Sequence, residues 1–331
     1  MVNKKDIKVS VLMPVFNSKL YIKEAIESIL AQTYSNFELI IINDGSTDGA
    51  DEVIRSFKDV RIKFINNKIN KGIVATLNEG LALSTGKYIA RMDSDDISLP
   101  HRLEKQVAFL ENNPEYKLCG SQATAVSSKG EKLHKLRRPT DFENIKVFNL
   151  FRNAFIHPTI MADACLLKKI GYDDEYVYAE DYFLFSQLTM NHKVADLGDE
   201  LLYYRLHNDS ITSKENTTMV KSELKTMEFL LSFLFDELDP KFIALHHSVL
   251  RPKQASFTKE ETHQHFISIL EKNREKKLFS PSILRKQLQK EWYKYLLLNA
   301  KDGALTAYLK SPLFHFLQGL NPKYIFKLLL K

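Results

Sequence analysis

Three carboxylate side chains stand within four residues at Asp93-Ser94-Asp95-Asp96. They follow the apolar run Tyr88-Ile89-Ala90, which has the composition of a buried strand. Because like charges so close together repel one another, the cluster needs water or a cation to neutralise it. Mg²⁺ is usually held by a few carboxylates together with substrate phosphates. The cluster therefore indicates either a divalent-cation site or a solvated turn in which Asp96 caps a following helix; spacing alone leaves both open.

Two further polar segments also come directly after apolar runs. Pro14-Val15-Phe16-Asn17 follows the run Lys8–Met13, and Asn43-Asp44-Gly45-Ser46 follows Phe37–Ile42. In an open sheet of parallel strands, ligands bind beyond the carboxyl ends of the strands. We therefore expect these two segments and the acidic cluster to face one crevice.

The elements that position these segments alternate between strand-like and helix-like patterns. Between residues 22 and 30, Ile22, Ala25, Ile26 and Ile29 recur at helical spacing. The β-α-β-α-β-α-β order with apolar strands predicts an α/β fold, a mostly parallel sheet flanked by helices. The patterns further predict helices at 51–57, 72–83, 102–111, 143–151, 166–171 and from Glu180. They predict strands at 61–65, 87–92 and 118–126, one or two strands over 193–207, and a loop at 129–139.

The charge is unevenly divided along the chain. Residues 212–331 carry 20 Lys and Arg against 12 Asp and Glu, whereas residues 1–211 carry 27 against 29. The hydrophobic content of 44% is that of an ordinary globular protein. The shift predicts a boundary between Ser210 and Asn216, with one domain at 1–212 and a basic, helical region at 213–331.

Neither the cysteines nor the apolar runs indicate an exported or membrane-spanning chain. Cys119 and Cys165 offer no disulfide framework or metal-ligand spacing, which fits a reducing compartment. The apolar stretch Val9–Phe16 contains Pro14 and is too short for a signal peptide or a membrane span, and no later run approaches about 18 apolar residues. We therefore expect a cytoplasmic protein.

Six segments, taken in chain order, resemble the motifs of one enzyme family. Together they are similar to the family 2 glycosyltransferases, nucleotide-sugar-dependent enzymes of the GT-A (Rossmann-like) fold. The resemblance runs from about Val9 to Thr212. It is carried by Ser10-Val11-Leu12-Met13-Pro14-Val15-Phe16-Asn17, by Asn43-Asp44-Gly45-Ser46-Thr47-Asp48, by Asn70-Lys71-Gly72 with Asn78-Glu79-Gly80, by Met92-Asp93-Ser94-Asp95-Asp96, by Ala179-Glu180-Asp181-Tyr182, and by Tyr204-Arg205-Leu206-His207 with Ser210 and Thr212.

The resemblance implies a role for each of these motifs. Asp95 is the expected first ligand of Mn²⁺ or Mg²⁺, assisted by Asp93 and by His207. Asp181 is the expected general base, which takes a proton from the acceptor hydroxyl while Glu180 orients the acceptor. The expected contacts to the nucleotide sugar are Pro14, Val15, Phe16, Asn17, Asp44, Lys71, Gly72, Asn78, Asp93 and Ser94.

Several residues keep a second interpretation. Asp44 either accepts the imide N–H of a uracil ring or forms an Asx-turn with Gly45. The charges of Glu180 and Asp181 also suit a helix N-terminus, and this reading is compatible with catalysis. His207 is either a metal ligand or a packed histidine, and Asp96 either supports the cation or caps a helix.

Three basic residues outside the motifs remain undecided. Arg137 and Arg138 either lie solvated in the loop at 129–139 or close over the diphosphate of the donor. His157, which precedes Pro158, is either structural or directed toward the acceptor.

Residues 213–331 lie outside the resemblance and show mainly helical patterns. Met227–Leu238 is apolar on most sides, and Trp292–Leu298 forms a second apolar patch. The end of the chain, Leu313–Lys331, mixes aromatic residues with lysines. Such a segment suits either a membrane surface or packing against the first domain or a second subunit. No aromatic and basic motif of a nucleic-acid-binding module is present in the sequence.

The resemblance implies a metal-dependent, inverting glycosyltransferase. It would move a sugar from a nucleotide-diphosphate donor, UDP-linked in the first instance, to a glycan or lipid-linked glycan in cell-surface polysaccharide synthesis (lipopolysaccharide or capsule). Its place would be the cytoplasm or the inner face of the cell membrane. The alternatives are a nucleotidyltransferase acting on sugar phosphates and a non-catalytic sugar-nucleotide-binding protein of the same fold. The former lacks a Gly-rich phosphate loop after the first strand.

Overall fold

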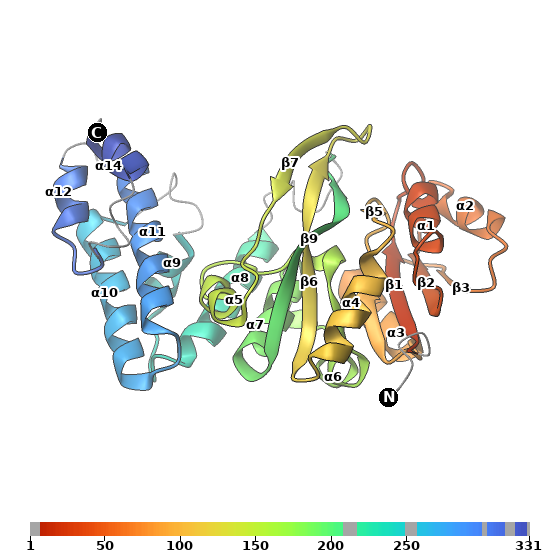
Figure 1. Ribbon diagram of the computed structural model, residues 1–331, viewed down its shortest axis with the longest axis horizontal. Coiled ribbons are helices and arrows are strands. Elements are labelled where there is room, and N and C mark those ends of the chain that lie inside the picture. The colour runs from red at the N-terminus through yellow and green to blue at the C-terminus, as the bar shows by residue number, and fades with distance from the viewer. Residues whose placement is uncertain (1–6, 208–216, 249–256, 300–302, 315–321, 330–331) are drawn as a thin grey trace. The chain divides into compact units, whose positions relative to one another are not determined.

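The structure is a computed structural model that describes residues 7–207, 217–248, 257–299, 303–314 and 322–329 (Figure 1). It divides into two compact units. The first comprises residues 1–145 and 153–222, and the second comprises residues 146–152 and 223–331. The expected boundary between Ser210 and Asn216 lies outside the described residues, and the roles assigned to residues 1–212 and 213–331 remain a prediction.

A nine-stranded sheet forms the centre of the first unit. Its strands follow the order β3-β2-β1-β4-β8-β6-β9-β5, with β7 paired to β6 outside this path. The first four strands of that order are parallel, and β6 is parallel to β9. The bounds are β1 (Val9–Val15), β2 (Phe37–Asp44), β3 (Ile62–Asn67), β4 (Tyr88–Arg91), β5 (Ile97–Ser98), β6 (Tyr116–Val126), β7 (Lys132–Leu136), β8 (Met161–Asp163) and β9 (Lys193–Arg205).

The register of the parallel strands brings the polar segments to one edge of the sheet. Leu12 of β1 pairs with Ile40 of β2 and with Arg91 of β4. Val15 pairs with Asn43, so β1 and β2 end together. The chain therefore leaves β1, β2 and β4 at the same edge, where ligands of such sheets bind.

Helices connect and cover these strands. In the first helix, Ile22, Ala25, Ile26 and Ile29 are all fully buried, which confirms the predicted apolar face. The α/β class and the helices expected between the strands are likewise confirmed. The bounds are α1 (Ile22–Leu30), α2 (Ala50–Ser56), α3 (Ile73–Leu83), α4 (Arg102–Asn112), α5 (Phe142–Asn149), α6 (Ala164–Ile170) and α7 (Glu180–Asn191).

The prediction of a loop at residues 129–139 was wrong. β7 lies within this segment and pairs antiparallel with β6, forming the hairpin seen at the sheet end in Figure 1. A tight turn joins the two strands, because the Ser127 N–H donates to the Glu131 carbonyl at 2.8 Å. Residues 132–135 are all exposed. An exposed, lysine-rich edge strand buries no apolar face, so its composition resembles that of a loop.

The second unit is helical, as the sequence predicts. Trp292 is fully buried and stacks on Tyr295, with 5.7 Å between the ring centroids. The guanidinium of Arg152 pairs with the buried carboxylate of Glu291, with nitrogen to oxygen distances of 2.6 and 3.0 Å. The bounds are α8 (Thr217–Ser232), α9 (Pro240–Ser248), α10 (Lys259–Lys276), α11 (Pro281–Asn299), α12 (Ala304–Leu309) and α14 (Pro322–Leu329). Among the described residues, no helix combines the length and apolar character needed to cross a membrane.

Candidate active site

The segments after β1 and β2 are interlocked by hydrogen bonds. Asn17 adopts a left-handed backbone conformation with φ of 50°. Its N–H donates to Ser46 Oγ, and its Oδ1 accepts from the N–H of Thr47, both at 2.9 Å. Pro14 and Val15 are buried in β1, whereas the side chain of Phe16 is 51% exposed. The end of β1 is thus a rigid turn that leaves one aromatic ring accessible to a ligand.

Asp44, at the end of β2, holds the loop that precedes α3. Its Oδ1 accepts from the N–H of Lys71 at 2.8 Å, and its Oδ2 accepts from the N–H of Gly72 at 2.9 Å. The carboxylate therefore contacts a loop that is distant in the sequence. It does not form the local Asx-turn with Gly45, which was one of its two interpretations. The ammonium of Lys71 donates to Glu79 Oε2 at 3.1 Å. A contact between Asp44 and uracil stays a prediction.

Each carboxylate of the cluster after β4 is held by a different partner. Asp93 Oδ1 accepts from Nη2 of Arg91 at 2.6 Å. Asp95 Oδ2 lies 2.8 Å from Nε2 of His207. Asp96 Oδ1 accepts from the backbone N–H of Arg205 at 2.8 Å. The cluster is therefore fixed from β4 on one side and from the end of β9 on the other.

Of the two interpretations of Asp96, the helix cap is wrong. Asp96 is only 1% exposed and is followed by the short strand β5. The next helix, α4, begins at Arg102, and the residue at its N-cap position is His101. The side chain of Asp96 instead points to the backbone of Arg205. The short strand β5, which pairs with β9, lies between Asp96 and α4.

The electrostatics of the cluster suit a divalent cation. Burial raises the pKa of Asp93, and burial together with the charges of Asp95 and Asp93 raises the pKa of Asp96 well above its ordinary value. One ligand oxygen from each of the three residues lies within 4.8 Å of the others. The buried Oδ2 of Asp96 has no hydrogen-bond partner. Such crowded oxygens fit a hard cation with oxygen ligands.

Arg205 organises the surroundings of the cluster. Its Nε donates to the carbonyl of Asp95 at 2.8 Å, and its Nη1 donates to the carbonyl of Ser128 at 3.1 Å. Its Nη2 pairs with Glu24 of α1 at 2.5 Å, and its guanidinium lies 4.8 Å from the ring centroid of Tyr21. One side chain thus ties the acidic turn to α1 and to the β6–β7 turn.

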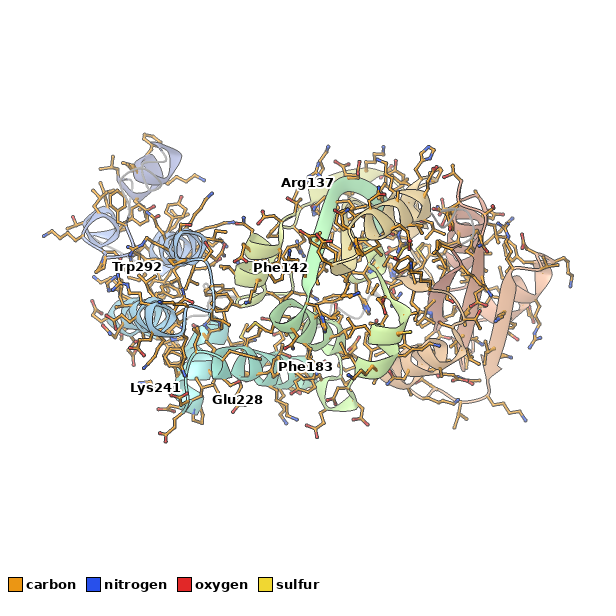
Figure 2. The ribbon with its side chains drawn as sticks, turned by 60° about the horizontal axis from the view of Figure 1, so that its bottom comes forward. Arg137, Phe142, Phe183, Glu228, Lys241 and Trp292 are labelled. Atoms are coloured by element: carbon orange, nitrogen blue, oxygen red, sulfur yellow. The ribbon has the colours of Figure 1, made fainter. Side chains whose placement is uncertain are left out.

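Glu180 and Asp181 form a second acidic pair at the start of α7. Asp181 Oδ2 accepts from Nδ2 of Asn153 at 2.8 Å, and its Oδ1 accepts from the N–H of Tyr182 at 2.6 Å. Burial raises the pKa of Asp181 to about 6, and burial with the Asp181 charge raises that of Glu180 to about 7. Phe183, labelled on α7 in Figure 2, stacks on Tyr176 with 3.6 Å between centroids. Glu180 and Asp181 therefore lie at a helix start that the stacking of Phe183 on Tyr176 holds in place.

His157 lies beside this acidic pair. Its Nδ1 is 4.0 Å from Asp181 Oδ2, and its Nε2 is 2.8 Å from the hydroxyl of Tyr172. Burial and the charge of Arg91 lower the pKa of His157 well below its ordinary value. The imidazole is therefore neutral at physiological pH and lies within the site.

Other predicted residues are engaged in structural contacts. The side-chain amide of Asn78 both donates to the carbonyl and accepts from the N–H of Tyr172, at 2.8 and 2.9 Å. Ser94 Oγ lies 2.7 Å from Ser18 Oγ. Arg137, labelled in Figure 2, pairs with Glu200 at 2.5 Å. The contacts of Asn78 and Ser94 with the nucleotide sugar remain predictions. The closing of Arg137 and Arg138 over the diphosphate also remains a prediction.

The structure adds residues that sequence reasoning missed. Arg91 precedes the acidic turn and is 4% exposed; a charged residue ending an apolar strand was the available signal. The fold brings Asn153 to Asp181 and Tyr172 to His157, so no local pattern indicated them. Ser210 and Thr212, which belonged to the sequence resemblance, lie outside the described residues.

Comparisons with known proteins identify the family to which the chain is similar. The family model described as Glycosyl transferase family 2 matches residues 10–169. The chain is 36% identical over 211 residues to the O-antigen biosynthesis glycosyltransferase WbnJ of Escherichia coli, covering 61% of this chain and 81% of WbnJ. It is 28% identical over 255 residues to the E. coli UDP-Glc:alpha-D-GlcNAc-diphosphoundecaprenol beta-1,3-glucosyltransferase WfgD, covering 76% of this chain and 96% of WfgD.

A solved structure shares the fold. Residues 1–349 of S. aureus TarS, crystallised in complex with UDP-GlcNAc, superpose with a TM-score of 0.59. The superposition covers 93% of this chain and 90% of that chain, at 17% sequence identity. At this identity the likeness supports the fold and not the substrate.

Proposed function

The chain belongs to glycosyltransferase family 2 and has the GT-A fold, and from this premise we propose that it transfers a sugar from a UDP-linked donor to a glycan hydroxyl with inversion. The observation that supports the proposal best is the placement of Asp181. It is a partly buried carboxylate with a raised pKa, fixed by Asn153 and by the N–H of Tyr182. His157 Nδ1 lies 4.0 Å from Asp181 Oδ2, and the carbonyl of Ile160, three residues after His157, accepts from the N–H of Arg91, which precedes the acidic turn.

Each group of the site has a part in this reaction. Asp181 takes the proton of the acceptor hydroxyl while the acceptor oxygen bonds to the anomeric carbon and the bond from that carbon to the phosphate oxygen breaks. Asp93, Asp95 and Asp96, with His207 beside Asp95, are the residues that would hold Mn²⁺ or Mg²⁺. When bound, such a cation neutralises charge on the departing diphosphate. No covalent intermediate with the enzyme is needed.

The acceptor belongs, in our proposal, to cell-surface polysaccharide synthesis. WbnJ is named for O-antigen biosynthesis, and the name of WfgD specifies a diphosphoundecaprenol-linked acceptor. We extend these names to a glycan or lipid-linked glycan acceptor for this chain. The enzyme would then work in the cytoplasm at the inner face of the membrane, and the basic residues 213–331 would contact the acceptor, the membrane surface or a second subunit.

A binding and transfer experiment tests the donor assignment. UDP, UDP-glucose, UDP-galactose, UDP-GlcNAc and UDP-GalNAc are added to the full chain with and without Mn²⁺, and the melting temperature is recorded. A ligand at about 100 times its Kd adds about 2.7 kcal/mol to stability, which raises the melting temperature by several degrees. We expect a rise of this size only with Mn²⁺ present, and release of UDP when an acceptor is added. Sugar-phosphate and nucleoside-triphosphate binding instead would favour the nucleotidyltransferase alternative, and binding without any turnover would favour a non-catalytic protein.

The pH dependence of transfer follows from the partly buried base. A general base works only when ionised, so a pKa of about 6 for Asp181 gives full activity above pH 7 and a falling rate below pH 6. We expect kcat/KM to fall about tenfold from pH 7 to pH 5. Initial rates at saturating Mn²⁺ measure this, with donor binding followed over the same range as the control. A constant rate between pH 5 and pH 7 with intact binding would contradict the assignment.

A further inference from the structure

Arg91 is a buried cation with unused hydrogen-bonding capacity. Its side chain is 5% exposed, and Nη2 donates to Asp93 at 2.6 Å. Its Nε and Nη1 are buried without a hydrogen-bond partner. Buried donors of a charged group are costly to leave unpaired, so an unmatched guanidinium in a binding crevice calls for an explanation. Pairing with Asp93 accounts for only one of its donors.

Glu180 has a buried hydrogen-bond acceptor without a partner. It is 8% exposed, and its Oε2 is buried with no hydrogen-bond partner. The charge of Arg91 acts on Glu180, on Asp181 and on His157. The backbone N–H of Arg91 donates to the carbonyl of Ile160 at 3.0 Å, three residues after His157, whose Nδ1 lies 4.0 Å from Asp181 Oδ2. Arg91 is thus joined to the acidic turn through Asp93 and to the segment of His157, which contacts the acidic pair. The structure leaves unpaired donors on Arg91 and an unpaired acceptor on Glu180 within the same candidate site.

The chemistry of these groups selects a neutral polar ligand. A hydroxyl group accepts a hydrogen bond from a guanidinium and donates one to a carboxylate at the same time. A carboxylate or phosphate would also pair with Arg91, but it would meet the buried oxygen of Glu180 and the charges of Asp93 and Asp181. Tyr172, whose hydroxyl contacts His157, and the neutral His157 add no positive charge. An uncharged polyol suits the site better than an anion.

We propose that Arg91 and Glu180 bind hydroxyl groups of the transferred sugar and so select an uncharged hexose or N-acetylhexosamine over a uronic acid. This inference rests on the proposed function, because the transferred sugar must lie between the leaving diphosphate and the base. Nε and Nη1 of Arg91 donate to the sugar, and Oε2 of Glu180 accepts from it. Neither group needs to contact the nucleotide.

The test separates the sugar from the nucleotide. Kd values for UDP, for the four uncharged UDP-sugars named above and for UDP-glucuronic acid are measured by calorimetry with Mn²⁺, on the wild-type chain and on Arg91→Met and Glu180→Gln. For the best uncharged donor, we expect the ratio of its Kd to that of UDP to rise about ten- to hundredfold in each variant. The Kd of UDP itself should stay within about threefold. Arg55→Met, at an exposed arginine of α2 that pairs with Asp51, is the matched control and should change neither value.

Each outcome decides between the alternatives. If both variants keep the wild-type ratio, or if the wild-type chain prefers UDP-glucuronic acid, the proposed sugar contacts are wrong. If UDP and the donor weaken equally, Arg91 acts only through Asp93, and that too overturns the inference. If the wild-type chain binds neither UDP nor any UDP-sugar, the proposed function itself fails. Should Arg91→Met not fold, Glu180→Gln alone carries the test, because it changes one atom of a side chain with an unpaired oxygen.

Discussion

Replacement of Asp181 by asparagine is expected to lower turnover by about 10²- to 10⁴-fold, the usual contribution of a positioned general base. Asparagine has nearly the same shape but cannot take the proton of the acceptor hydroxyl. The side chain is held by Asn153 at 2.8 Å and by the N–H of Tyr182 at 2.6 Å. Asn153 Oδ1 already accepts from the N–H of Phe155, so the side-chain amide of Asn153 keeps its NH₂ group toward residue 181. An asparagine at 181 has one oxygen and one NH₂ group, so one of its two hydrogen bonds becomes a contact between two donors. Folding should therefore weaken by only about 1 kcal/mol.

The measurement compares transfer with binding. Single-turnover transfer is followed on the variant, and UDP-sugar binding is followed by melting temperature with Mn²⁺. Asp196→Asn is the matched control, because Asp196 is also an aspartate whose pKa burial raises to about 6. It is held by Gln122 at 2.5 Å and by the N–H of Gly198 at 2.8 Å, outside the proposed site. We expect this control to bind and transfer normally. Unchanged turnover in Asp181→Asn with intact donor binding would contradict the role of Asp181 as base.

The strand ends of the site can be predicted from the sequence, because the buried strands of a parallel sheet are runs of apolar residues. β1 and β2 are buried at every position, so the polar residues that follow them mark the edge where the chain leaves the sheet. The same reasoning places Glu180 and Asp181 at a helix start, which α7 confirms. Local composition and periodicity are sufficient for these features.

The remaining features depend on partners far away in the chain. Asp44 binds Lys71 and Gly72 instead of the adjacent turn. Asp96 loses its expected capping role because the backbone of Arg205, 109 residues away, donates to it. Long-range pairings of this kind follow from strand order in the sheet, and no local pattern encodes them. The unpaired nitrogens of Arg91 likewise become visible only when its neighbours are placed.

Replacement of Asp95 by alanine is expected to weaken the Mn²⁺-dependent part of donor binding by at least about tenfold. Asp95 stands between Asp93 and Asp96 in the chain, and ligand oxygens of all three approach within 4.8 Å. Its Oδ2 also contacts His207 at 2.8 Å, so its loss removes one expected ligand and releases another. Loss of a group that only supports a metal ligand commonly costs 10- to 100-fold in affinity, and loss of a ligand should cost at least about as much.

Donor binding is therefore titrated against Mn²⁺ on the wild-type chain, on Asp95→Ala and on Asp199→Ala. Asp199 carries an exposed carboxylate that pairs with Lys105 at 2.6 Å, so its removal controls for the loss of one negative charge. In Asp95→Ala, the Mn²⁺ concentration for half-maximal donor binding should rise by at least about tenfold, while weak metal-free binding of UDP should persist. Removal of a carboxylate from a crowded cluster also relieves repulsion, so we expect the metal-free variant to melt no lower than the wild type. Equal Mn²⁺ dependence in all three proteins would place the cation away from Asp95. If Asp95→Ala melts far below the wild type, the titration is made on Asp95→Asn, which keeps a side chain of the same shape beside His207 and removes only the charge.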